Sequence, residues 1–267
     1  MAVPNHNLSA KMLELIKSSS LGDQRTEQWF NIRRTMVTAS EIAAIINPNE
    51  PGARNAVMRR KTGNGGDYDT SNVAAIQHGV VNEINAIKAF EKQTGEIVIA
   101  FGLLRHPEIP WIGGSPDGIT LSGALIEVKC PWTRKPDGKI PEQYYPQVQT
   151  LLEISSLEKA YFIDYIPETE LVKEEMFIVE VRRDRAWFQE KLPILQEFYN
   201  QLQDVNNKRK TIEEVLLPLR RGGKRKMETG TVEATEEPEK EPEKEPEKTE
   251  VKKWRGFKDD SIKGCVL

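Results

Sequence analysis

The sequence predicts an α/β fold of the α+β kind, with a central mixed β-sheet flanked by helices. Three observations predict it. The chain has 267 residues, enough to bury a sizeable core. Its residues are 38% hydrophobic and 30% charged, a composition typical of soluble proteins. Strand-like segments gather in the middle of the chain and helix-like segments lie on either side.

The first third of the chain has helical patterns. We expect a helix over 26–33 and another that opens near Thr38, because a Glu three residues after this Thr completes the spacing of a capping box. Apolar residues recur at helical spacing over about 72–94, which predicts a longer helix. Gly95 then predicts its end.

The middle of the chain is predicted to form the sheet. A strand over 97–103 precedes a β-hairpin, in which 118–121 and 124–130 flank a loop containing Leu121, Ser122 and Gly123. The remaining expected elements are a helix around 142–155, strands over 160–165 and 174–181, and a helix over about 185–203, with 206–219 as a terminal helix or extension.

Composition divides the chain into a leader at 1–24, a globular body at 25–219 and a tail at 220–267. Residues 228–250 hold ten Glu and three Lys, a net charge of -7, so the other residues carry +4 although the whole chain carries -3. A mildly basic body is compatible with a nucleic-acid partner. Three Glu-Pro-Glu-Lys repeats predict a disordered tail with a short apolar segment at its end.

Some classes of protein are excluded early. Two cysteines cannot build a disulfide framework or a four-thiolate metal site. No apolar run is long enough to span a membrane, and we expect no secretory signal. The expected location is intracellular, in the cytoplasm, or in the nucleus if the basic cluster Arg220–Lys226 is a localisation signal. The same cluster also fits a DNA-binding arm or a solvated basic stretch.

A charged pair carries the chemistry. Glu127 and Lys129 are two residues apart on a predicted strand, so both side chains point to the same face. If the hairpin closes with a three-residue loop and a left-handed Gly123, Asp117 lies opposite Glu127 and the two carboxylates can share a divalent cation. A two-residue loop would instead place Asp117 opposite Val128.

The expected cation is Mg²⁺, with Mn²⁺ as a substitute. Two carboxylates, a backbone carbonyl and waters are the hard oxygen ligands that Mg²⁺ prefers. Lys129 beside it would orient a water or stabilise charge that develops on phosphorus. Taken alone, the spacing also fits an exposed cross-strand pair next to an ordinary turn.

Further motifs favour the metal site over an exposed cross-strand pair. Together they resemble the phage lambda exonuclease (YqaJ-type alkaline exonuclease) branch of the Asp…(Asp/Glu)-x-Lys nuclease superfamily, over about Trp29 to Gln203. The resemblance implies a restriction-endonuclease-like nuclease core. It rests on five segments in the family's order, which are Trp29…Arg33…Val37–Ser40, Gly79…Glu83, Ser115–Gly118, Glu127–Trp132 and Tyr144…Gln147–Gln149.

The resemblance implies a role for each matching residue. Asp117, Glu127 and the main-chain carbonyl of Val128 match the metal ligands, and Lys129 matches the catalytic lysine. Glu83 matches a helix carboxylate that faces the metal directly or through water, and Gln147 matches the glutamine that helps hold the nucleophile. Read alone, Glu83 and Gln147 are ordinary polar helix residues.

Arg33 and Ser40 match residues that hold the 5′-terminal phosphate in this family. A helix that opens at Thr38–Ser40 would add free N–H groups, and Arg33 would add a bidentate fork. Without the resemblance both are common surface residues. The family's further basic residue has no clear counterpart, and Arg54 is only a weak candidate for it.

The function implied is a Mg²⁺-dependent exodeoxyribonuclease that degrades linear double-stranded DNA from its ends, 5′ to 3′, in DNA recombination and repair. The resemblance also implies a homotrimeric ring and a partner that anneals single strands. One alternative is a structure-specific endonuclease or nickase with the same metal site. The other is a DNA-binding recombination module with a vestigial nuclease site.

Overall fold

The computed structural model describes residues 9–19, 24, 26–65, 73–170 and 172–219. The chain divides into two compact units, Met1–Arg221 and Gly222–Leu267. The second unit, the predicted disordered tail and the basic cluster Arg220–Lys226 lie outside the described residues. No helix in the described ranges is long and apolar enough to cross a bilayer.

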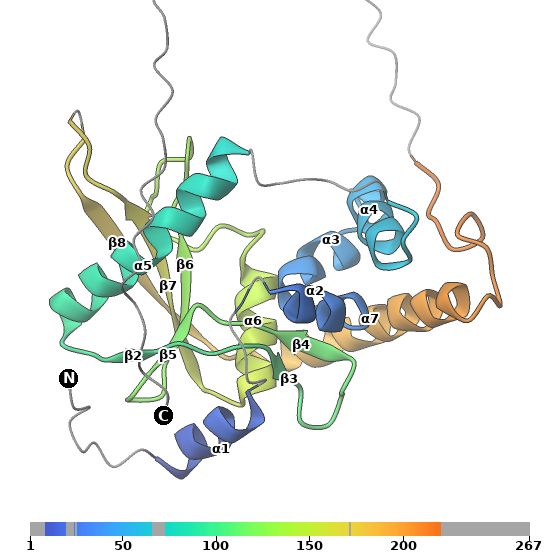
Figure 1. Cartoon of the computed structure of the whole chain (residues 1–267), viewed down its shortest axis with the longest axis horizontal. Coiled ribbons are helices and arrows are strands. Elements are labelled where there is room, and N and C mark those ends of the chain that lie inside the picture. The colour runs from blue at the N-terminus through green and yellow to red at the C-terminus, as the bar shows by residue number, and fades with distance from the viewer. Residues whose placement is uncertain (1–8, 20–23, 25, 66–72, 171, 220–267) are drawn as a thin grey trace, which may run out of the picture. The chain divides into compact units, whose positions relative to one another are not determined.

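In the first unit most of the helices precede a run of strands, and the last helices follow within and after the sheet (Figure 1). The helices are α1 Ala10–Ser18, α2 Glu27–Arg34, the 3-10 turn η1 Ala39–Glu41, α3 Ile42–Ile46, α4 Pro51–Lys61, α5 Ala74–Thr94, α6 Tyr145–Ser155 and α7 Arg185–Asn206. The strands are β1 Val37–Thr38, β2 Val98–Ile99, β3 Leu104–Arg105, β4 Ile112–Gly114, β5 Gly118–Thr120, β6 Leu125–Lys129, β7 Lys159–Ile166 and β8 Glu175–Arg182.

The predicted α/β architecture with a mixed sheet is confirmed. The larger sheet has the order β2-β5-β6-β7-β8, in which only β6 and β7 run parallel, and a smaller sheet has the order β1-β4-β3. Helix α6 makes the connection between the parallel strands. Gly95 ends α5 with a left-handed φ of 73°, as expected.

Several elements differ from the sequence-based expectation. The single strand over 97–103 is wrong, because only Val98 and Ile99 pair with β5, and Leu104 and Arg105 pair with β4 of the other sheet. Helix α4 and the short strands of the smaller sheet were not expected. Residues 207–219 form turns and an extended segment, so of the two expected alternatives the extension is confirmed and the helix is wrong.

Helix α1 belongs to the packed body, although its residues fall in the expected leader. Met12 and Leu15 are buried in the main core, where α1 contacts β3. Ser9 caps this helix by accepting a hydrogen bond from the N–H of Met12 at 3.2 Å. The expected limits of the three parts at 24 and 219 stay predictions.

The larger sheet separates two hydrophobic clusters, because successive side chains of a strand point to opposite faces. Leu125 and Phe162 pack with residues of α6 on one face. Ile126 and Ile163 pack with Phe90 of α5 on the other face. Figure 1 shows α5 lying across the sheet. The alternation therefore directs Glu127 and Lys129 to the face that α6 covers.

At two positions glycine is required because neighbouring atoms leave no room for a Cβ. A Cβ on Gly114 would lie 2.6 Å from Cδ2 of Leu151 and 2.9 Å from Cβ of Ala39. A Cβ on Gly118 would lie 2.3 Å from Cγ1 of Val98. These glycines bracket Asp117, so the tight packing of neighbouring elements fixes the segment that carries this carboxylate.

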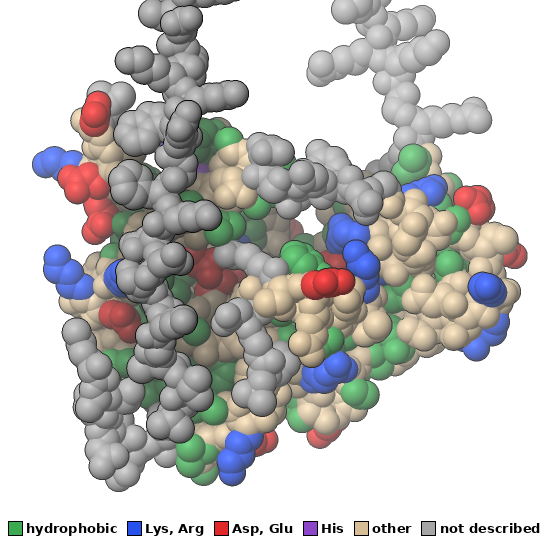
Figure 2. All heavy atoms as spheres, in the orientation of Figure 1, with side chains coloured by type: hydrophobic (Ala, Val, Ile, Leu, Met, Phe, Trp, Pro, Cys, Tyr) green, Lys and Arg blue, Asp and Glu red, His purple; other side chains and the backbone are tan. Residues whose placement is uncertain are grey.

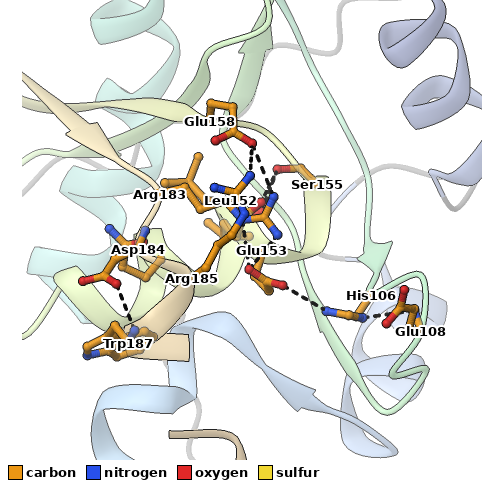
Figure 3. A network of polar contacts seen from close by, with 12 residues as sticks. His106, Glu108, Leu152, Glu153, Ser155, Glu158, Arg183, Asp184, Arg185 and Trp187 are labelled. Atoms are coloured by element: carbon orange, nitrogen blue, oxygen red, sulfur yellow. Dashed lines mark hydrogen bonds and ion pairs between the residues drawn. The ribbon is translucent and has the colours of Figure 1, made fainter. Parts of the chain in front are cut away.

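A polar network holds α6 in place (Figure 3). Glu153 of α6 accepts from Nη2 and Nε of Arg183 at 2.7 and 2.9 Å, and its other oxygen lies 3.8 Å from Nε2 of His106. Nδ1 of His106 accepts from the N–H groups of Glu108 and Ile109 at 3.1 and 3.0 Å. Burial lowers the pKa of His106, opposed by Glu153, so the ring stays neutral at pH 7.

We predict opposite effects of two glycine substitutions on stability. Gly114→Ala should lower the free energy of unfolding by about 1–3 kcal/mol, because its Cβ overpacks the core. Gly79→Ala should raise it by about 0.5–1 kcal/mol, because its Cβ meets no atom within 4 Å in α5 and alanine is the better helix former. Urea unfolding measures both, and two changes of the same sign would contradict the close-packing argument.

Candidate active site

The β5–β6 hairpin has the register expected for a three-residue loop. Gly118 is paired with Ile126, and Gly123 has a φ of 88°. The N–H of Asp117 donates to the carbonyl of Ile126 at 3.2 Å. Oδ2 of Asp117 accepts from the N–H of Val128 at 2.7 Å, so the carboxylate continues the ladder beyond β5. Asp117 thus lies opposite Glu127.

Glu127 has two unequal oxygens. Its Oε1 accepts from Nζ of Lys129 and from Nε2 of Gln147, both at 2.5 Å. Its Oε2 is buried and has no hydrogen-bond partner in the described part of the chain. The side chain is 1% exposed. A buried, unpaired carboxylate oxygen is costly, so this geometry favours an additional cation beside Oε2.

The charged groups of the site shift one another's pKa values. Burial raises the pKa of Asp117 well above its usual range, the charge of Glu127 adds to this rise and Lys129 opposes it. Burial also raises the pKa of Glu127, again opposed by Lys129. Burial alone would lower the pKa of Lys129, but Glu127 and Asp117 outweigh it, so the pKa rises and the amine stays cationic.

The donors fit Mg²⁺. Asp117, Glu127 and the carbonyl of Val128 can offer oxygen ligands from two adjacent strands, and the orphaned Oε2 of Glu127 is where an ion would relieve the largest electrostatic cost. No three His, Cys, Asp or Glu side chains in the described ranges converge closely enough to form a metal site. The remaining ligands would have to be water, which Mg²⁺ usually retains.

Glu83 lies near the two carboxylates. It is half-buried on α5, and its charge raises the pKa values of Asp117 and Glu127. Burial, Glu83 and Asp117 raise the pKa of the neighbouring Cys130 thiol to about 12, which keeps it protonated and unreactive. Glu83 is therefore close enough to the two carboxylates for its charge to act on them.

Arg33 and Ser40 come together as expected. Nη2 of Arg33 donates to Oγ of Ser40 at 3.0 Å and to Oγ1 of Thr38 at 3.3 Å. The guanidinium stacks 4.1 Å from the ring centre of Trp29. The expected helix opening is only a three-residue 3-10 turn followed by the five residues of α3, so the side chains, and not a helix dipole, would bind an anion here.

The sequence-based prediction missed two basic residues beside Arg33. We call Arg33, Arg60 and Lys61 the Arg33 cluster. Arg60 and Lys61 end α4 and bind Glu41, with Nη2 and Nζ at 3.0 and 2.8 Å from its oxygens. Lys61 is buried and also donates to the carbonyl of Arg33 at 2.9 Å, whereas the side chain of Arg60 is 59% exposed. Figure 2 shows Lys and Arg side chains gathered between α2 and α4. The run Arg59-Arg60-Lys61 was the available signal.

Arg54 lies elsewhere. It is buried, donates to the carbonyl of Val215 at 3.3 Å and to Oε1 of Gln201, and stacks on Phe198. Its guanidinium is thus occupied in holding α4 to α7 and to the segment after it. This placement argues against Arg54 as a phosphate ligand.

Helix α2 and Gln24 before it connect the Arg33 cluster to the segment that carries Asp117. Nε1 of Trp29 donates to Oγ of Ser115 at 3.0 Å, two residues before Asp117. Nε2 of Gln24 donates to the carbonyl of Pro116 at 3.1 Å. An anion on Arg33 would therefore be held at a fixed place relative to the carboxylates.

The similarity to known proteins agrees with this geometry. Residues 28–158 match the family described as the YqaJ-like viral recombinase domain. Over these residues, just under half of the chain, the sequence is similar to that family. The match includes every candidate site residue discussed above. No curated protein sequence matches the chain significantly.

Solved structures show the same fold. The chain is 29% identical to the alkaline exonuclease LHK-Exo from Laribacter hongkongensis, with a TM-score of 0.60, and the match covers 71% of this chain and 99% of that one. LHK-Exo in complex with dAMP gives a TM-score of 0.59 at the same identity and coverage. A phage-related exonuclease from Haemophilus somnus 129PT, 16% identical with a TM-score of 0.50, covers 63% of this chain and 95% of its own, and supports the fold alone.

We predict that Asp117 makes the metal-free protein less stable as the pH rises. Because its pKa is raised in the folded state, its stabilising effect is complete below the unfolded value of about 3.9 and is lost as the pH rises through the folded-state value. Asp117→Asn should remove this loss, which amounts to about 1.4 kcal/mol for each unit by which the pKa is raised.

The measurement is urea unfolding between pH 4 and 9 in the presence of a chelator. Glu142→Gln, a substitution of an exposed carboxylate, is the matched control and should follow the wild type. A wild-type profile parallel to that of Asp117→Asn would contradict the assignment.

Proposed function

We propose that the protein is a Mg²⁺-dependent exodeoxyribonuclease that degrades linear double-stranded DNA from its ends, 5′ to 3′, in DNA recombination. The observation that carries the proposal is the buried Oε2 of Glu127, which lacks a partner in the described structure while Lys129 and Gln147 hold the other oxygen. The alkaline exonuclease neighbours support an enzyme that acts on DNA ends.

Different residues of the site would bind the metal ion, stabilise the developing charge and orient these groups. Asp117, Glu127 and the carbonyl of Val128 would hold the ion, which when bound supplies a Lewis acid for phosphoryl oxygens and water. Lys129 remains cationic and would stabilise negative charge that develops on the phosphate. Gln147 fixes the orientation of Glu127, and Tyr144 lies with its ring centre 5.0 Å from Nζ of Lys129 and restricts that amine.

The Arg33 cluster would bind the 5′ end of the DNA strand. Arg33 and Ser40 offer donors to a 5′-terminal phosphate, and Arg60 brings a largely exposed second guanidinium. Arg33, Arg60 and Lys61 lie around a single carboxylate, Glu41, so positive charge exceeds negative charge here. A doubly charged phosphate would relieve that excess. The ring of three subunits and an annealing partner stay predictions of the family resemblance.

We predict that Asp117→Ala and Lys129→Ala abolish cleavage in different ways. Asp117→Ala should lower the rate at least about a thousandfold, or about 4 kcal/mol, and leave DNA binding nearly unchanged. Lys129→Ala should lower the rate about a hundredfold or more without changing the Mg²⁺ concentration needed for half-maximal activity. End-labelled linear duplex, with Mg²⁺ or with a chelator, measures both.

The matched control is Lys135→Ala, which removes an exposed cation from the loop after β6 and should retain the wild-type rate. Residual activity of Asp117→Ala within tenfold of wild type would show that this carboxylate is not a metal ligand. Cleavage of closed circular DNA would favour an endonuclease.

We predict that Arg33→Ala erases the preference for 5′-phosphorylated ends. The rate on a 5′-phosphate end should fall about tenfold or more, because a charge-assisted hydrogen bond is lost, while the rate on a 5′-hydroxyl end should not change. Arg60→Ala should act in the same direction. Arg59→Ala removes an exposed charge from the same helix and serves as the control. Equal losses on both ends would assign Arg33 to folding or general DNA binding.

A further inference from the structure

We propose that Trp132, set edge to face with His78, is a stacking platform for the unpaired nucleobases next to the phosphodiester that is cut. The inference rests on the proposed nuclease function and adds to it a residue that holds the digested strand. The two ring centres lie 5.0 Å apart with an angle of 79° between the planes.

The exposure of Trp132 requires an explanation. Its residue surface is 60% exposed, whereas Trp29, Trp111 and Trp187 are half-buried. Trp29 stacks on Arg33 and Trp111 stacks on Tyr199, so both have partners for their ring faces. Trp132 contacts His78 at an edge-to-face angle, which leaves ring surface open to solvent. A flat exposed aromatic ring suits a nucleobase.

The segments that carry the two rings are anchored by neighbouring contacts. Trp132 lies between Lys129, which is held by Glu127, and Arg134, which forms a two-pronged ion pair with the buried Asp164. On the other side, Asn82 donates to the carbonyl of His78 at 2.9 Å and lies 3.3 Å from its Nδ1. These contacts hold the chain beside Trp132 and at His78, which reduces the entropy lost when a base binds.

The platform lies beside the candidate catalytic groups. Trp132 is the third residue after Lys129, a backbone path of at most about 11 Å. His78 precedes Glu83 by five residues of α5, a rise of about 7.5 Å. Trp132 thus follows the strand that carries Glu127 and Lys129, and His78 lies on the helix that carries Glu83.

A stacking surface is needed at this place. Glu127 is buried and Asp117 and Lys129 are half-buried, so a phosphodiester has to leave the surface of the duplex to reach them. Its bases then lose their stacking and pairing. Trp132 would replace part of that stacking without selecting a sequence, because every base has an aromatic face.

The test measures binding separately from cleavage. Fluorescence anisotropy with the full chain in Ca²⁺ compares two 5′-phosphorylated duplexes, one with adenine and one with abasic sites at the first two nucleotides of the 5′ strand. Trp132→Ala should raise Kd about tenfold on the adenine duplex and leave Kd on the abasic duplex unchanged. Trp132→Phe should restore binding to within about threefold, since it keeps an aromatic face.

Ile194→Ala, which shortens a 41% exposed side chain on α7, should change neither Kd. An equal loss on both duplexes, or no loss on either, would overturn the platform. So would altered subunit association without a change in DNA binding, because Trp132 would then contact protein. Cleavage of the same duplexes in Mg²⁺ tests the proposed function separately, since base-dependent binding without cleavage would overturn only that function.

Discussion

The structure depends on a carboxylate that is only half satisfied. Lys129 and Gln147 both bind Oε1 of Glu127, whereas Oε2 is buried without a partner in the described residues. Leaving such an oxygen unpaired costs about 1–3 kcal/mol or more. The hairpin register adds a second carboxylate directly opposite, although like charges repel. Both costs are relieved by the same event, the arrival of a cation, so we interpret them as the preorganisation of a metal site.

The same constraint explains the conformation of the hairpin. A shift of register by one residue would turn Glu127 and Lys129 to the other face of the sheet, which is apolar and covered by α5. Gly118 prevents this by packing its backbone against Val98, and Asp117 prevents it by accepting the N–H of Val128. Position and charge are therefore specified together, and the hydrogen bond that fixes the register also orients Asp117.

Local patterns predicted much of the fold, because the capping box at Thr38, the stop at Gly95 and the hairpin loop depend on neighbouring residues. The register followed from loop geometry and alternation, so the proximity of Asp117, Glu127 and Lys129 could be deduced. Arg54 and Arg60 could not be distinguished in this way. Arg54 is buried by partners 147 and 161 residues away, and Arg60 meets Glu41 only because α4 folds back beside α2. The strand predicted over 97–103 failed because the chain leaves the larger sheet after Ile99 and joins the smaller sheet only at Leu104.

The carboxylate of Glu41 lies within the Arg33 cluster for a physical reason. Lys61 is almost fully buried and would destabilise the fold without a partner, which Glu41 supplies at 2.8 Å. Burial alone would raise the pKa of Glu41, but Lys61, Thr38 and Arg60 outweigh it and lower the pKa, so the group stays charged. Glu41 thereby neutralises the hidden cation and holds Arg60 in place, while Arg33 remains directed at Ser40. The carboxylate thus neutralises the buried charge of Lys61 and leaves the largely exposed charge of Arg60 at the surface.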